Sequence, residues 1–163
     1  MAAANGDDFK RYQERVRGTN ISEQTLLATD YLNHFNEIVM LLEMVADIPE
    51  CFEDAKDWAP KSYPDHFLDS GFSDKELAVE AYEHVPTCFR QPFDNTVGAM
   101  NNLVLTSLQR IEVSLEQGDD AATRDAVANV SGGLHKLIEV ASAIIHGHES
   151  TLEQDEIDTL LNG

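Results

Sequence analysis

The chain has 163 residues, 42% of them apolar, which is the composition of one globular domain and not of a disordered chain. Its 30 acidic residues outnumber its 11 basic residues, so the formal charge at pH 7 is −19. A surface of this charge repels phosphate groups, which argues against direct binding of nucleic acid or of an anionic membrane and favours a basic protein partner. No stretch approaches the roughly 20 consecutive apolar residues of a membrane span.

The first residues predict a flexible N-terminal segment over residues 1–20. Within it, Phe9, Tyr12 and Val16 would share one face of a short helix. The basic residues of this segment are not followed by an apolar stretch of signal-peptide length. The two cysteines have neither the spacing of a metal site nor the number of a disulfide framework, so we expect reduced thiols and a cytoplasmic protein.

Residues 26–48 have the clearest helical periodicity in the chain. Apolar side chains recur there at alternating spacings of three and four, which is typical of a helix with a wide buried face. Ser22 is placed to cap the start of this helix, and Pro49 ends it or begins the next. The recurring positions are Ala28, Tyr31, Phe35, Ile38, Leu42 and Val45.

The sequence next predicts a helical insertion with two short turns, at residues 50–57 and 64–70. Trp58 lies between the two turns, where a large aromatic side chain is expected to close one end of a helical bundle. Ser73 and Glu76 have the spacing of a capping box, which predicts that another short helix begins at that point.

Two further long amphipathic helices are predicted after the insertion. The first begins at residues 89–93 and ends at Gly118, and the second is capped by Asp119 or Asp120. No segment shows the alternation of a β-strand. We therefore predict that residues 21–148 form an all-α domain, an antiparallel four-helix-like bundle with a short helical insertion. A homodimer is compatible with such a bundle.

Two histidine–glutamate pairs suggest an alternative function as a helical bundle that binds a metal or a small ligand. His34 and Glu37 share one helix face, and Glu80 and His84 share another. Helical di-iron proteins carry Glu-x-x-His on each of two helices, whereas this chain has His-x-x-Glu once and Glu-x-x-x-His once. We therefore expect hydrogen-bonded pairs and no resident cofactor, with these four residues as the candidate ligands of the alternative.

Asp125 and Asn129 lie one turn apart on the last predicted helix. A carboxylate beside an amide on a helix can position a water, coupled to Mg²⁺, for attack on an acyl phosphate. The same spacing is also common on solvated helix surfaces. The pair is the candidate catalytic site, and no nucleophile–base set or phosphate-binding loop accompanies it in the sequence.

The last residues, 149–163, form an acidic amphipathic segment with five acids and no base. Ile157, Leu160 and Leu161 would form one apolar edge if the segment became helical. Because it is too short to be stable as an isolated helix, we expect a flexible tail that folds when it docks into the groove of a partner. The acids nearest the apolar edge, which would meet a basic rim, are Asp155, Glu156 and Asp158.

Residues 154–163, QDEIDTLLNG, resemble the N-terminal segment of the flagellar motor switch protein FliM and, less closely, the C-terminal tail of the chemotaxis phosphatase CheZ. In both families this peptide binds the response regulator CheY, preferentially when CheY is phosphorylated. The resemblance covers about ten of the 163 residues. It implies a role in chemotaxis or flagellar motility in which the tail binds a CheY-like regulator.

The rest of the chain carries no recognised family pattern. In FliM the peptide precedes a different domain, whereas CheZ is helical, ends in the peptide and has a catalytic Asp-x-x-x-Gln pair. The nearest counterpart here is Asp125-x-x-x-Asn129, with asparagine in place of glutamine. The resemblance therefore implies an adaptor or a CheZ-like acyl-phosphate phosphatase, with Mg²⁺ held by the regulator. A non-enzymatic scaffold is the remaining alternative.

Overall fold

The computed structural model describes the backbone of residues 2–147 and the side chains of residues 7–147. Within this range the chain is all-α, as predicted, and its nearest approach to a β-sheet is one isolated bridge between Ile21 and Ala28. The helices, with η denoting 3₁₀ turns, are α1 (Ala2–Val16), η1 (Thr29–Leu32), α2 (Asn33–Val45), η2 (Pro49–Cys51), α3 (Phe52–Ala55), α4 (Tyr63–Asp69), α5 (Lys75–Tyr82), α6 (Thr87–Glu116) and α7 (Asp120–Ile145).

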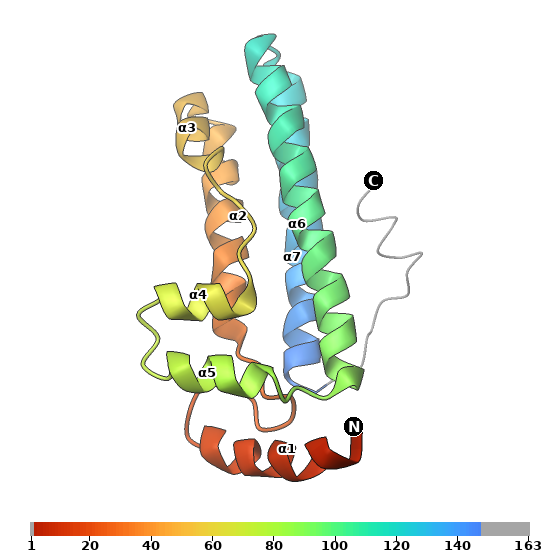
Figure 1. Ribbon diagram of the computed structural model, residues 1–163. Helices are drawn as coiled ribbons and strands as arrows, with labels where there is room; N and C mark the ends of the chain where they lie inside the picture. Colours follow the sequence, from red (N-terminus) through yellow and green to blue (C-terminus); the bar gives the residue numbers. More distant parts are fainter. Residues whose placement is uncertain (1, 148–163) are drawn as a thin grey trace.

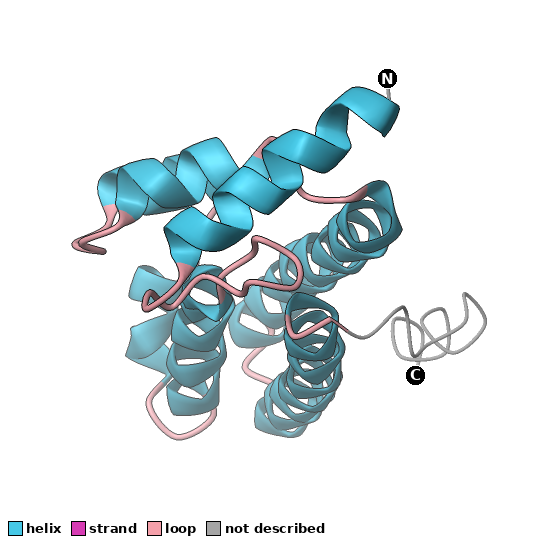
Figure 2. Cartoon of the chain, turned by 90° about the horizontal axis from the view of Figure 1, so that it is seen from below, coloured by secondary structure: helices cyan, strands magenta, loops and turns pink. Residues whose placement is uncertain are grey.

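Three helices, α2, α6 and α7, run alongside one another, and the shorter helices gather mainly around their lower end (Figure 1). Helix α7 packs against both α6 and α2 and runs antiparallel to them. Seen from below, α1 lies across the ends of the long helices (Figure 2). The predicted four-helix arrangement is therefore not confirmed, because the described residues supply three helices in that direction and place the others elsewhere.

The apolar positions predicted for the first long helix are all buried. The helix itself, however, begins at Asn33, seven residues later than the periodicity of residues 26–48 suggests, because residues 21–28 form a compact loop and the 3₁₀ turn η1 follows it. Leu26 has a left-handed backbone with φ of +68°, and its N–H bonds to the carbonyl of Ser22. Ile21, Leu26 and Leu27 are buried in this loop, and Ser22 therefore caps no long helix.

The N-terminal segment is helical and packed, where the sequence predicted a flexible segment over residues 1–20. Tyr12 and Val16 on α1 are 5% and 0% exposed, and Phe9 packs beside them, so the predicted apolar face is confirmed. The Tyr12 ring stacks on the imidazole of His84 with their centroids 4.6 Å apart. Residues 9–16 therefore pack against the body of the fold.

The helix caps predicted from the sequence are present between α6 and α7 and absent at the start of α5. Gly118 has φ of +67° and ends α6, while the Asp119 carboxylate accepts the N–H of Ala122 and caps α7 at 3.0 Å. The Ser73–Glu76 capping box predicted for α5 is not formed, because the residue before the helix is Asp74, which makes no side-chain cap.

A buried threonine ties the 21–28 loop to the end of α7. Thr25 is fully buried, and its hydroxyl donates to the carbonyl of Ile145 at 2.6 Å while accepting the N–H of Leu27 at 3.3 Å. The α7 end therefore has one of its free carbonyls satisfied by a residue 120 positions earlier in the chain. Within residues 2–147, no helix is both long enough and apolar enough to cross a membrane.

We predict that Thr25→Val lowers the free energy of unfolding by about 1–3 kcal/mol, measured by urea unfolding followed by circular dichroism. Valine keeps the shape of threonine but leaves the Ile145 carbonyl and the Leu27 N–H without their partner. Thr106→Val, at an exposed position of α6, is the matched control and should change stability by less than about 0.5 kcal/mol. An equal effect of the two substitutions would contradict a role for the buried hydroxyl.

Candidate functional site

Helix α7 places Asp125 and Asn129 on its solvent side. Both side chains are exposed, and the spacing of four residues puts them one above the other on the helix surface. The neighbouring Arg124 turns toward α2 and pairs with Asp47 at 3.2 Å. The two side chains of the predicted pair are thus neighbours on the helix surface and accessible to a partner. Ordinary solvated helix faces are exposed in the same way.

The predicted partner-binding residues of the tail lie outside the described residues. These are Asp155, Glu156, Ile157, Asp158, Leu160 and Leu161. The described chain leads to them through the end of α7, where His146 Nδ1 donates to the Ser142 carbonyl at 2.8 Å and Gly147 has φ of +102°. The imidazole therefore satisfies one of the free carbonyls at the C-terminus of α7.

The first of the candidate metal ligands, His34 on α2, is held in a contact with Trp58. The two rings stack with centroids 4.7 Å apart, and the indole N–H donates to the His34 carbonyl at 3.1 Å. His34 Nε2 donates to the carbonyl of Ala59 at 2.8 Å. Burial lowers the pKa of His34 below its ordinary value of 6.5, although the bond to Ala59 and the charge of Glu37 act in the opposite direction.

The second pair, Glu80 and His84, faces α1 instead. Glu80 forms an ion pair with Arg15 at 3.2 Å, and His84 stacks on Tyr12 with Asp8 4.0 Å from its Nδ1. Among residues 7–147, no three histidine, cysteine or carboxylate side chains are grouped in a way that could hold a metal. The structure therefore does not bring the four predicted ligands together.

A cluster of aromatic side chains at the base of α6 was not predicted from the sequence. Tyr31, Tyr63 and Phe93 are almost fully buried there, and burial raises the pKa of Tyr31 to about 12. Beside them lies a hollow of about 220 Å³, also lined by Asn101 of α6. The Asn101 Oδ1 is buried and has no hydrogen-bond partner within the part of the chain that is described.

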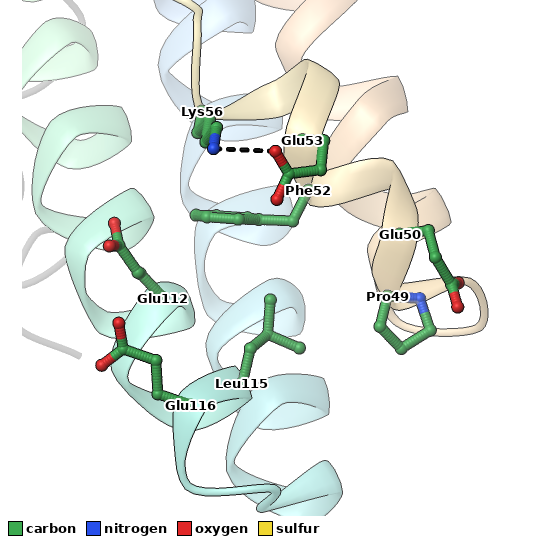
Figure 3. A pocket seen from close by; sticks show the side chains of 8 residues that line it. All are labelled: Pro49, Glu50, Phe52, Glu53, Lys56, Glu112, Leu115 and Glu116. Atoms are coloured by element: carbon green, nitrogen blue, oxygen red, sulfur yellow. Dashed lines mark ion pairs between the residues drawn. The ribbon is translucent and has the colours of Figure 1, made fainter.

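A larger groove, about 430 Å³, lies at the opposite end of the long helices, between α3 and the end of α6 (Figure 3). Its lining combines two apolar side chains, Phe52 and Leu115, with several glutamates. The residues come from two segments about 60 positions apart, so no local sequence motif predicts the groove. The sequence signal was limited to an excess of acids in both segments.

Comparison with family models, with curated proteins and with solved structures finds no significant match to this chain. Function is therefore inferred from the side chains and from their arrangement.

We predict that acidification destabilises the protein through His34. A pKa lowered in the folded state means that, as the pH falls through 6.5, the unfolded chain takes up a proton that the folded chain does not. His34→Gln keeps an N–H donor for Ala59 but cannot titrate, so its free energy of unfolding should fall less between pH 7.5 and pH 5. Urea unfolding at the two pH values measures the difference.

His66→Gln is a second test of the same effect of pH on the free energy of unfolding. Burial also lowers the pKa of His66, whose Nε2 bonds to the Asp30 carbonyl at 3.1 Å, so this variant should shift in the same direction. A His34→Gln protein that loses as much stability on acidification as the unsubstituted protein would contradict the assignment.

Proposed function

We propose that this chain binds a CheY-like response regulator through residues 149–163. The observation that carries the proposal is the peptide QDEIDTLLNG, in which Ile157, Leu160 and Leu161 have helical spacing and acids flank them. An acidic helix with three apolar anchors suits a hydrophobic groove with a basic rim. The resemblance to the CheY-binding peptides of FliM and CheZ rests on the same residues.

The charge of the protein supports a partner of this kind. At −19, the chain attracts a basic surface over distances comparable to the Debye length, about 8 Å at physiological ionic strength. Such attraction raises the rate of association more than the final affinity. The proposed complex should therefore form faster at low salt, and its partner is a protein of the cytoplasm that acts in chemotaxis or motility.

The role of the helical body is either that of an adaptor or that of a CheZ-like phosphatase. In favour of the second role, Asp125 and Asn129 are exposed one turn apart on α7, where a bound regulator can reach them. Their carboxylate and amide would orient the attacking water, and the Mg²⁺ that neutralises the acyl phosphate would belong to the regulator. Asparagine is one methylene shorter than the glutamine of CheZ.

We predict that the chain binds CheY-like regulators of its own organism more tightly when a phosphoryl mimic is present. Ile157→Ala or Leu160→Ala should weaken binding at least tenfold, because each removes an apolar anchor. Thr159→Ala, in the same segment and away from the apolar edge, is the control and should bind nearly as the unsubstituted chain does. Calorimetric titration of each protein measures the affinities.

Deletion of residues 149–163 completes this test. The proposal requires that binding be lost while the helical circular dichroism of the body is kept. Retained binding without the tail would refute it, and no binding of the full chain to any regulator would leave the body as a scaffold.

If the chain is a phosphatase, Asp125→Ala and Asn129→Ala should each lower the rate of regulator dephosphorylation by at least tenfold with little change in binding. The matched control is Glu139→Ala, which is also exposed on α7 but lies more than two turns further along. Release of phosphate from the phosphorylated regulator measures the rate. If the unsubstituted protein does not raise the rate of dephosphorylation above that of the regulator alone, or if neither substitution lowers that rate, the adaptor role holds.

A further inference from the structure

The groove between α3 and the end of α6 has an apolar floor and acidic walls. Figure 3 shows the Phe52 ring from α3 and the Leu115 side chain from α6 at its base. Glu112 and Glu116 extend from the α6 side of the same space. On the other side the walls are Pro49, Glu50, Glu53 and Lys56.

The charges of this groove are not balanced within the described chain. Lys56 is its one basic residue, and its Nζ already pairs with Glu53 at 2.7 Å. The imbalance extends beyond the groove, because residues 43–57 and 110–125 together contain eleven acids and three bases. A cationic group entering the groove would therefore meet a net negative potential.

The backbone of α6 adds to this potential. Glu116 lies in the last turn of the helix and Glu112 one turn earlier, and the last turn has no basic residue. Helix C-termini carry a partial negative charge, so carboxylates are unfavourable there and lysine or arginine is the favoured residue. Glu116 therefore lies where a carboxylate is unfavourable, with Glu112 one turn away on the same helix.

Apolar surface beside the groove points to a protein segment as the occupant. Ile48, directly before Pro49, is 50% exposed, and Val113 of α6 is also 50% exposed. A free metal ion would gain nothing from this apolar surface, and no metal-binding group of side chains is found among residues 7–147. Phosphate ligands and the acidic tail of the same chain would be repelled.

We propose that this groove binds a basic amphipathic helix of a partner protein. One or more apolar side chains of that helix pack on Phe52 and Leu115, and its lysine or arginine residues, three or four positions away, pair with Glu112 and Glu116. The interaction is independent of the regulator proposed for the tail, and it uses the opposite end of the long helices from α1.

The test uses an 18-residue helical peptide of leucine and lysine with one apolar face, labelled for fluorescence anisotropy. A scrambled peptide of the same composition has the same charge and lacks the apolar face. We expect the amphipathic peptide to bind the full chain at least tenfold more tightly than the scrambled one. Equal binding of the two peptides would show attraction by charge alone and would overturn the proposal.

Charge reversal then locates the site. The double variant Glu112→Lys/Glu116→Lys should weaken binding of the amphipathic peptide at least tenfold. The control is Glu83→Lys/Glu139→Lys, which makes the same change in net charge at exposed positions elsewhere. It should weaken binding less than threefold. Deletion of residues 149–163 should leave the affinity unchanged. Equal effects of the two double variants, or loss of binding on deletion of the tail, would overturn the proposal.

A stability measurement separates lost binding from lost folding. Because both side chains lie at the surface and Glu116 is at the negative end of α6, the double variant should keep its helical circular dichroism and a Tm within about 4 °C of the unsubstituted protein. Chemical shifts of backbone amides in residues 49–56 and 112–116 should move when the peptide binds the unsubstituted protein. Chemical-shift changes confined to other residues would contradict the assignment of the groove.

Discussion

The packing of α7 between α6 and α2 is the constraint on which the rest of the structure depends. A helix with neighbours on two sides must bury a wide apolar face, and α7 does so with eleven buried residues, from Thr123 to Ile145. Asp125 and Asn129 lie on the side that remains exposed. Their exposure is therefore a consequence of the fold, and a catalytic role for them requires that a partner approach this side of α7.

Periodicity in the sequence was sufficient to predict the long helices, and in residues 26–48 all the apolar positions that it singles out are buried. It was insufficient at the start of α2. There the apolar pattern continues through Leu26 and Leu27, while the backbone turns at Leu26 with a positive φ. Both a helix and a compact loop bury these residues, and what favours the loop is the distant contact of Thr25 with α7, which no local pattern contains.

The candidate sites also differ in whether they depend on local spacing or on contacts between distant segments. The position of Asp125 and Asn129 on one face of α7 could be predicted, because helical spacing can be read from the sequence. His34 and His84 were misleading for the same reason, since each shares a face with a glutamate but stacks on an aromatic ring of another segment. The groove of Phe52 and Leu115 was missed because its two walls meet only through the packing of α2 and α6 on α7.

The distribution of charge links stability to binding. The α1 end of the fold carries clustered basic residues, whereas the opposite end carries carboxylates even at the C-terminus of α6, where they are unfavourable. Self-repulsion of this kind destabilises a compact chain, and a basic partner relieves it on binding. The two proposed docking elements, the tail and the groove, are both acidic beside apolar anchors, so both select basic amphipathic surfaces.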